Sequence, residues 1–112
     1  TETYDLLDAI ASRGFASVIS LHGLADDEVL VGGGLPAETK AAVRDRLDAA
    51  LSVPVSVASA TGAYAGTSDA NFVNWLAADG AGLQLEQGDT ARRLESGAVV
   101  TTLESLLANG VI

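Results

Sequence analysis

The chain has 112 residues, a length that suits one domain with a single hydrophobic core, so we expect residues 1–112 to form one domain. Fifteen acidic residues against six basic ones give a formal net charge of -9, which disfavours binding to nucleic acid or to an acidic membrane surface. The sequence contains no cysteine, which excludes disulfide bonds, a thiolate nucleophile and a cysteine-based metal site.

The acidic composition and the absence of long apolar runs also bear on location. Lys40 is the only lysine, and such a composition is typical of proteins from salt-rich cytoplasms, so salt adaptation is our hypothesis. No apolar run approaches the roughly 20 residues of a membrane-spanning helix. Residues 1–5 are acidic where a signal peptide would be basic. We therefore expect a soluble, cytoplasmic protein that is not secreted by a signal peptide.

The first third of the chain predicts one helix followed by two strands. Apolar residues at helical spacing predict a helix over about residues 4–13, ended by Gly14 in a left-handed conformation. The β-branched, apolar run over residues 16–21 predicts a strand that stops at His22. Residues 28–34 predict a second short strand that runs into three glycines.

The middle of the chain contains the strongest helical pattern. The segment 36–51 begins with a proline and places Val43, Leu47 and Leu51 on one face, which predicts a helix. Residues 53–59 carry alternating valines and predict a strand at an edge or at its own start, because the segment includes a proline. A loop is expected to follow.

The last part of the chain completes the alternation. Ser68 or Asp69 is expected to cap a short helix that is stopped by Gly80. Residues 82–86 predict the last strand, and a final helix is expected over about residues 98–108. The predicted order is α-β-β-α-β-α-β-α, and the fold class is α/β, with a small mixed sheet covered by helices.

Two residues at predicted strand ends are candidates for chemistry. His22 follows the first strand and Glu86 ends the last one. Functional residues of open α/β sheets gather at the carboxyl ends of strands, so these two side chains could share a cleft. A lone histidine after a strand is more often a hydrogen-bonded structural residue than a metal ligand, and that alternative stays open.

Three other patterns carry weaker signals. The glycines at 32–34 lack the Lys-Ser or Lys-Thr of a phosphate loop, so we expect a bulge or positive φ angles there. No serine lies in a G-x-S-x-G elbow, which disfavours a serine nucleophile activated by histidine. The acidic residues 26–28 predict a solvated loop, with weak cation binding as the lesser alternative.

Three segments in a fixed order carry a family resemblance. "SVISLHG…VLVGG", "NFVNWL" and "GLQLEQGDTARR" span about residues 16–93 and together resemble the C-terminal half of the poly-γ-glutamate hydrolase family, zinc enzymes with a carboxypeptidase-like fold. The resemblance implies that His22 is a zinc ligand, that Glu86 is the general base, and that Asn74 lies in the substrate-binding cleft.

The chain departs from the family pattern in two ways. The other zinc ligands of the family belong to a His-x-x-Glu-like motif in an N-terminal half, whereas this chain has one histidine in total, too few ligands for catalytic zinc. After Asn74 the family has an arginine that would grip a substrate carboxylate, and this chain has Trp75. Arg92 or Arg93 is expected to serve local structure or a helix-end ion pair.

Three functional hypotheses follow. The favoured one is a non-catalytic relative that binds no cofactor and acts as a structural or assembly protein. It would form a homo-oligomer or join a larger assembly such as a virion. Trp75 and Tyr64 would then be interface anchors, with core packing as the alternative. The second is a zinc-dependent γ-glutamyl hydrolase whose missing ligands come from another chain. The third is a peptide- or glycan-binding module with its cleft beside His22, Asn74 and Glu86.

Overall fold

The computed structural model describes residues 5, 6, 8, 9 and 14–112. The helix predicted over residues 4–13 therefore lies largely outside the described residues. Gly14 has a φ of 67°, the left-handed conformation that was predicted for it.

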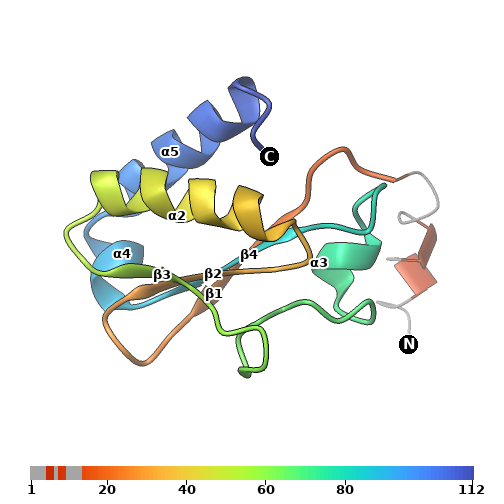
Figure 1. Ribbon diagram of the computed structural model, residues 1–112, viewed down its shortest axis with the longest axis horizontal. Coiled ribbons are helices and arrows are strands. Elements are labelled where there is room, and N and C mark those ends of the chain that lie inside the picture. Colours follow the sequence, from red (N-terminus) through yellow and green to blue (C-terminus); the bar gives the residue numbers. More distant parts are fainter. Residues whose placement is uncertain (1–4, 7, 10–13) are drawn as a thin grey trace.

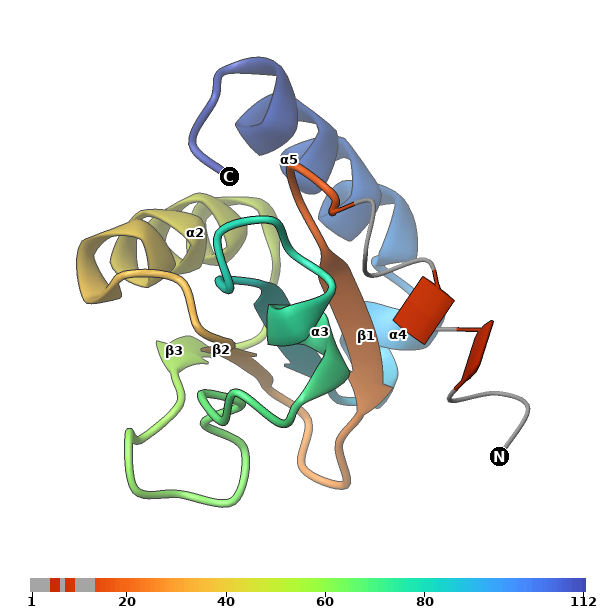
Figure 2. The ribbon, with the colours of Figure 1, turned by 90° about the vertical axis from the view of Figure 1, so that its right-hand side faces the viewer.

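Within the described residues, four short strands form one mixed sheet in the order β1-β4-β2-β3 (Figure 1, Figure 2). The parallel pairs are β1 (Ile19–Gly23) with β4 (Leu83–Gln87) and β2 (Val29–Gly32) with β3 (Val55–Val57). The two central strands, β4 and β2, run antiparallel. The last strand in the sequence is therefore inserted between the first two, and β1 forms one edge of the described sheet.

Helices α2 (Ala37–Ala50) and α5 (Ser96–Ala108) lie over one face of this sheet (Figure 1). The predicted helix 36–51 is thereby confirmed, with Pro36 as its N-cap instead of its first residue. The core between helices and sheet consists of aliphatic side chains, each of which contributes about 1.5–3 kcal/mol when fully buried. Its most buried members are Val29, Val31, Val43, Leu47, Leu83, Leu85, Ala91, Val99 and Leu106.

The opposite face of the sheet is more polar. Side chains alternate across a strand, so the neighbours of core residues Leu83 and Leu85, which are Gln84 and Glu86, point away from α2 and α5. The loop over residues 58–71 lies below this face in Figure 1 and approaches the Gln84 amide at Gly66. Helices therefore cover one face, and a loop covers part of the other.

The limits of β1 differ from the predicted strand. The prediction that the strand stops at His22 is wrong, because His22 lies inside β1 and is paired with Glu86 of β4. The residues at 16–18 have a strand-like sequence but lie outside β1, and of these three only Val18 bonds to β4, by accepting from the Leu83 backbone N–H at 2.9 Å. Pairing with β4, and not the apolar pattern, sets where β1 begins and ends.

The cap of helix α3 (Phe72–Trp75) also differs from the prediction. The Asn71 side-chain oxygen accepts a hydrogen bond from the backbone N–H of Val73 at 3.3 Å, so Asn71 is the N-cap. Neither Ser68 nor Asp69 has this role. The helix is a single turn, too short for its apolar spacing to indicate where it starts.

Helix α4 (Asp89–Arg93) was not predicted, and it lies between the predicted strand at 82–86 and the predicted final helix. The Asp27 carboxylate, from the loop between β1 and β2, accepts hydrogen bonds from the backbone N–H of Thr90 at 2.8 Å and from its hydroxyl at 2.6 Å. A cap supplied from so distant a part of the sequence leaves no local signal. The other predicted helices and strands that fall within the described residues are present, with ends shifted by a few residues.

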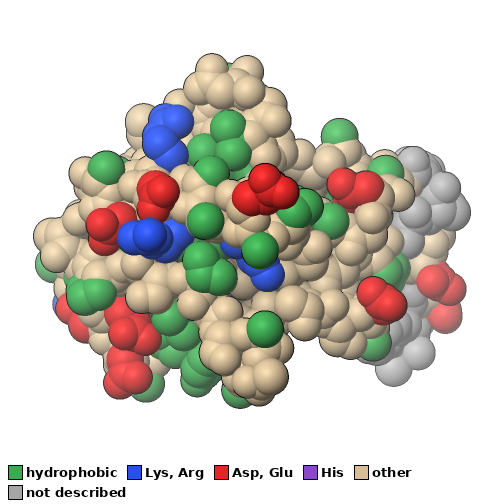
Figure 3. Space-filling view, in the orientation of Figure 1, with side chains coloured by type: hydrophobic (Ala, Val, Ile, Leu, Met, Phe, Trp, Pro, Cys, Tyr) green, Lys and Arg blue, Asp and Glu red, His purple; other side chains and the backbone are tan. Residues whose placement is uncertain are grey.

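The surface reflects the acidic composition. Acidic side chains are scattered over the face drawn in Figure 3, with the fewer basic side chains among them. Arg44 forms an ion pair with Asp45 at 2.9 Å, and both side chains are well exposed, so the pair adds little to stability. No helix within the described residues combines the length and the apolar character that crossing a membrane requires.

Candidate active site at the β1–β4 pair

His22 and Glu86 lie side by side in the sheet. They are partners in the parallel register of β1 and β4, so both side chains leave the same face of the sheet. His22 is exposed on the edge strand, whereas the Glu86 residue is 6% exposed on the inner strand. The two residues that were expected to share a cleft are thus neighbours in the sheet. Their roles as metal ligand and general base stay predictions.

The buried Glu86 carboxylate accepts a hydrogen bond from one amide side chain, which is itself bonded to a second amide; the sequence analysis singled out neither residue. Gln84 Nε2 donates to Glu86 Oε1 at 3.3 Å, and Asn71 Nδ2 donates to Gln84 Oε1 at 3.0 Å. A buried carboxylate is costly without such donors. Gln84 was detectable in principle, because it lies two residues before Glu86 and must share its face of the strand.

Ser20 adds an unsatisfied group to the same face. It is the register partner of Gln84, and its hydroxyl oxygen is buried without a hydrogen-bond partner among the described residues. Buried hydroxyls are usually paired, because an unpaired one costs about 1–3 kcal/mol. The face that carries His22 and Glu86 therefore has an unused hydrogen-bonding group.

Asn74 has all of its hydrogen-bonding positions occupied within the chain. Its side-chain oxygen accepts from the backbone N–H of Gly34 at 2.8 Å and of Gly82 at 3.0 Å. Its amide nitrogen donates to the backbone oxygens of Gly66 at 2.8 Å and Ser68 at 3.0 Å. The residue is 1% exposed. Substrate binding by Asn74 stays a prediction, and it would require some of these bonds to break.

The triple glycine serves close packing around this amide. Gly33 has a φ of 102°, as predicted for this turn, and a Cβ there would lie 2.1 Å from the backbone oxygen of Gly82. A Cβ on Gly34 would lie 2.7 Å from the Asn74 side-chain oxygen. A Cβ on Gly32 would lie 2.6 Å from the backbone oxygen of Tyr64, so close contacts explain all three glycines without a phosphate ligand.

The two arginines after β4 have local roles, as expected. Arg92 Nε donates to the backbone oxygen of Gln87 at 3.0 Å, which ties α4 to the end of β4. Arg93 forms an exposed ion pair with Asp89 at 2.8 Å, one turn earlier in α4. These contacts confirm the prediction of local structure and a helix ion pair.

The two aromatic residues proposed as interface anchors lie in different environments. Trp75 is half-buried at the end of α3, and Tyr64 is 44% exposed in the loop over residues 58–71. The partial exposure of both leaves a role in an interface open, and that role stays a prediction.

The acidic loop after β1 is a structural feature. The hydroxyl of Thr90, and after it the Thr90 backbone N–H, lower the pKa of the exposed Asp27 carboxyl below its usual 3.8. Across the described part of the chain, no three His, Asp or Glu side chains converge on a point where a metal ion could bind. Neither this loop nor the pair of His22 and Glu86 therefore forms a complete metal site.

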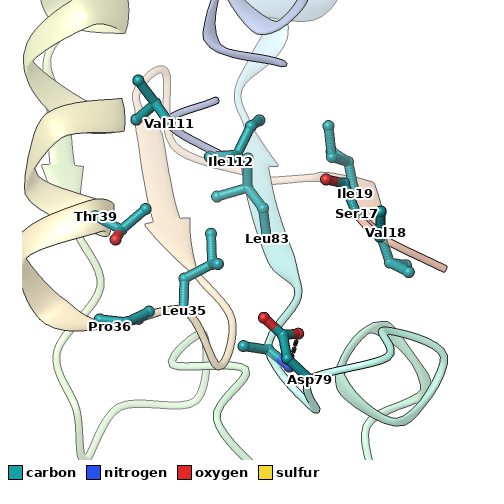
Figure 4. A pocket seen from close by; sticks show the side chains of 12 residues that line it. Ser17, Val18, Ile19, Leu35, Pro36, Thr39, Asp79, Leu83, Val111 and Ile112 are labelled. Carbon is teal, nitrogen blue, oxygen red and sulfur yellow. Dashed lines mark hydrogen bonds between the residues drawn. The ribbon is translucent and has the colours of Figure 1, made fainter. Parts of the chain in front are cut away.

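Glu86 lines neither of two hollows that the described residues form beside the sheet. One, of about 290 Å³, lies at the β1 edge between His22, Arg92 and Val100. The other, of about 260 Å³, lies near the start of β1, and Figure 4 shows how Leu35, Leu83 and Ile112 surround it. Both have mainly apolar walls, so they differ in character from the polar face around Glu86.

Comparison of the sequence with protein-family models identifies the family of this chain. The family model described as poly-gamma-glutamate hydrolase matches residues 4–95, which include all four strands. The chain therefore belongs to the poly-gamma-glutamate hydrolase family. Among curated protein sequences, none matches this chain.

Two solved structures resemble this family member. The apo, zinc-free form of YndL has a TM-score of 0.75 and 22% identity, and the match covers 94% of this chain and 60% of YndL. A bacteriophage poly-gamma-glutamate hydrolase has a TM-score of 0.57 and 33% identity over 70% of this chain and 37% of that protein. The α/β class and the resemblance to part of a carboxypeptidase-like domain are confirmed, and the chain spans 60% or less of either protein.

Proposed function

We propose that these 112 residues carry part of the active site of a zinc-dependent hydrolase of γ-glutamyl polymers. In this proposal His22 is one metal ligand and Glu86 is the general base. The observation that supports it is the pairing of these residues in the β1–β4 register, with the Glu86 carboxylate held by Gln84. Both residues also lie within the segment matched by the family.

The chemistry divides between the metal and the protein. Zinc, when bound, supplies a positive charge that polarises a carbonyl group and lowers the pKa of water. The Glu86 carboxylate would accept the proton of the attacking water and later deliver it to the leaving amine. Catalytic zinc needs three protein ligands, and this chain offers one imidazole. The remaining ligands would come from outside these 112 residues.

The 112-residue chain alone is therefore expected to bind zinc weakly and to leave poly-γ-glutamate intact. Mixing it with a polypeptide that carries the His-x-x-Glu-like motif of the family should produce stoichiometric zinc and cleavage. Glu86→Gln should lower this cleavage at least 100-fold, because the base is lost. His22→Ala should release the zinc. Metal analysis and chromatography of the polymer measure both effects.

The exposed Glu104 on α5 offers a matched control for this experiment, and Glu104→Gln should leave cleavage unchanged. Cleavage by the 112-residue chain alone would contradict the proposal. Zinc that stays bound in the His22→Ala variant would contradict it as well.

A non-catalytic assembly protein is the second candidate, and the edge of the sheet favours it. No described strand pairs with the outer edge of β1, and Leu21, on the helix-facing side of this strand, is 54% exposed. Apolar side chains on a free strand edge favour association. A homo-oligomer or a virion component would use this edge. A metal-free oligomer that His22→Ala leaves intact and Leu21→Asp dissociates, seen by sedimentation, would support this candidate over the hydrolase.

A further inference from the structure

We infer that Gln84 and Asn71 are positioning residues for Glu86: they hold the carboxylate in one orientation by a directed chain of hydrogen bonds. This inference deepens the proposed hydrolase function and rests on it. It assigns a purpose to two side chains that neither the family resemblance nor the zinc chemistry explains.

The series of hydrogen bonds that leads to Glu86 begins at the N-cap of α3. Asn71 Oδ1 accepts from the backbone N–H of Val73 at 3.3 Å, which leaves its Nδ2 to point elsewhere. That nitrogen donates to Gln84 Oε1 at 3.0 Å. Because the Gln84 oxygen is engaged by Asn71, its Nε2 faces Glu86 and donates at 3.3 Å. One backbone N–H in α3 thus determines which group meets the carboxylate.

Packing keeps Gln84, the middle residue of this hydrogen-bond series, in place. Gln84 is 6% exposed, and Gly66 lies so close above it that a Cβ at Gly66 would be 2.9 Å from Gln84 Nε2. A side chain enclosed in this way has few other rotamers available. The loop over residues 58–71 therefore restrains Gln84, and Gln84 restrains Glu86.

The arrangement leaves half of the carboxylate for chemistry. Within the described residues, the Glu86 carboxylate accepts a hydrogen bond from Gln84 at Oε1 and none at Oε2. A base must have its accepting oxygen aimed at the proton that it removes. Fixing Oε1 by a donor sets the direction of Oε2, which a purely space-filling Gln84 would not do.

The experiment uses the labelled 112-residue chain in solution, without zinc or substrate. In the wild type, the Hα–Hβ couplings of Glu86 should report a single χ1 rotamer, and the Gln84 side-chain amide protons should exchange at least about tenfold more slowly than in a free glutamine. Gln84→Met keeps the size of the side chain but removes both hydrogen bonds. The Glu86 couplings should then become averaged over several rotamers.

A second variant tests which amide groups donate and which accept in this series. Asn71→Asp keeps the oxygen that caps α3 but replaces the donor to Gln84 by an acceptor. The Gln84 amide should turn around and present its oxygen to Glu86, which again releases the carboxylate. Gln87→Met is the matched control, because Gln87 is equally buried on β4 but lies on the opposite face of the sheet. It should leave the Glu86 couplings unchanged.

Each outcome decides the inference. A single Glu86 rotamer that persists in either Gln84→Met or Asn71→Asp overturns it, and so does an averaged rotamer in the wild type. Backbone amide spectra establish that every variant is folded. The measurement needs no catalysis, so it tests the hydrogen bonds to Glu86 separately from the hydrolase proposal. In an active complex, Gln84→Met should lower kcat about tenfold to 100-fold and leave KM nearly unchanged.

Discussion

The buried amide of Asn74 joins backbone groups from three separate parts of the chain. It binds Gly34 at the end of the triple-glycine turn, Gly82 at the start of β4, and the segment from Gly66 to Ser68. Each partner is a backbone group that would otherwise need another way to be satisfied. The family motif around Asn74 therefore has a structural role that its resemblance to a binding residue did not suggest.

The substitution Asn74→Ala should lower the free energy of unfolding by about 3 kcal/mol or more, because it leaves several buried backbone groups without partners. Urea denaturation followed by circular dichroism measures the change. Asn109→Ala, at the exposed end of α5, is the control and should cost less than about 1 kcal/mol. A comparable loss in both variants would show that Asn74 has no special structural weight.

At the scale of elements, the loop between β1 and β2 and the short helix α4 depend on each other. Asp27 caps α4 through Thr90, and its pKa is lowered in the folded chain by these hydrogen bonds. A group with a lowered folded-state pKa stabilises the fold fully above its unfolded value, near 3.8, and loses this effect as the pH falls through the folded value.

The variant Asp27→Ala should consequently melt at a lower temperature than the wild type at pH 6. The difference between the two melting temperatures should shrink as the pH falls below about 4, because the wild-type carboxylate becomes protonated. Thermal unfolding over this pH range tests the prediction. Asp26→Ala, at the neighbouring exposed position, is the control at pH 6 and should melt closer to the wild type, because Asp27 and not Asp26 bonds to Thr90. A difference for Asp27→Ala that is constant with pH would argue against the cap.

At the scale of the whole molecule, the net charge of -9 acts against a compact state through self-repulsion. The ion pairs of Arg44 with Asp45 and of Arg93 with Asp89 are both exposed and relieve little of it. Mobile salt ions can screen the remaining charges, since the screening length falls to about 3 Å near 1 M salt.

Raising KCl from about 0.1 M to about 2 M should therefore raise the melting temperature. The combined variant Asp48→Asn and Glu104→Gln removes two exposed charges and should show a smaller rise. Differential scanning calorimetry measures both. A melting temperature that falls or stays constant with KCl would sink the hypothesis of salt adaptation.

The sequence by itself determined the features that depend on neighbouring residues along the chain. The helix at 36–51 follows from its apolar spacing, the α/β class follows from the alternation of elements, and the family follows from three ordered motifs. His22 and Glu86 were also singled out as candidates in this way. Periodicity and motifs are local, so a single sequence displays them directly.

Only the tertiary structure decided how distant segments meet. It inserts β4 between β1 and β2, caps α4 with Asp27, and brings Asn71 and Gln84 to Glu86. Strand register and long-range hydrogen bonds join residues far apart in the sequence, and many pairings are compatible with the same local pattern. The packed core selects one of them, and with it the surroundings of Glu86.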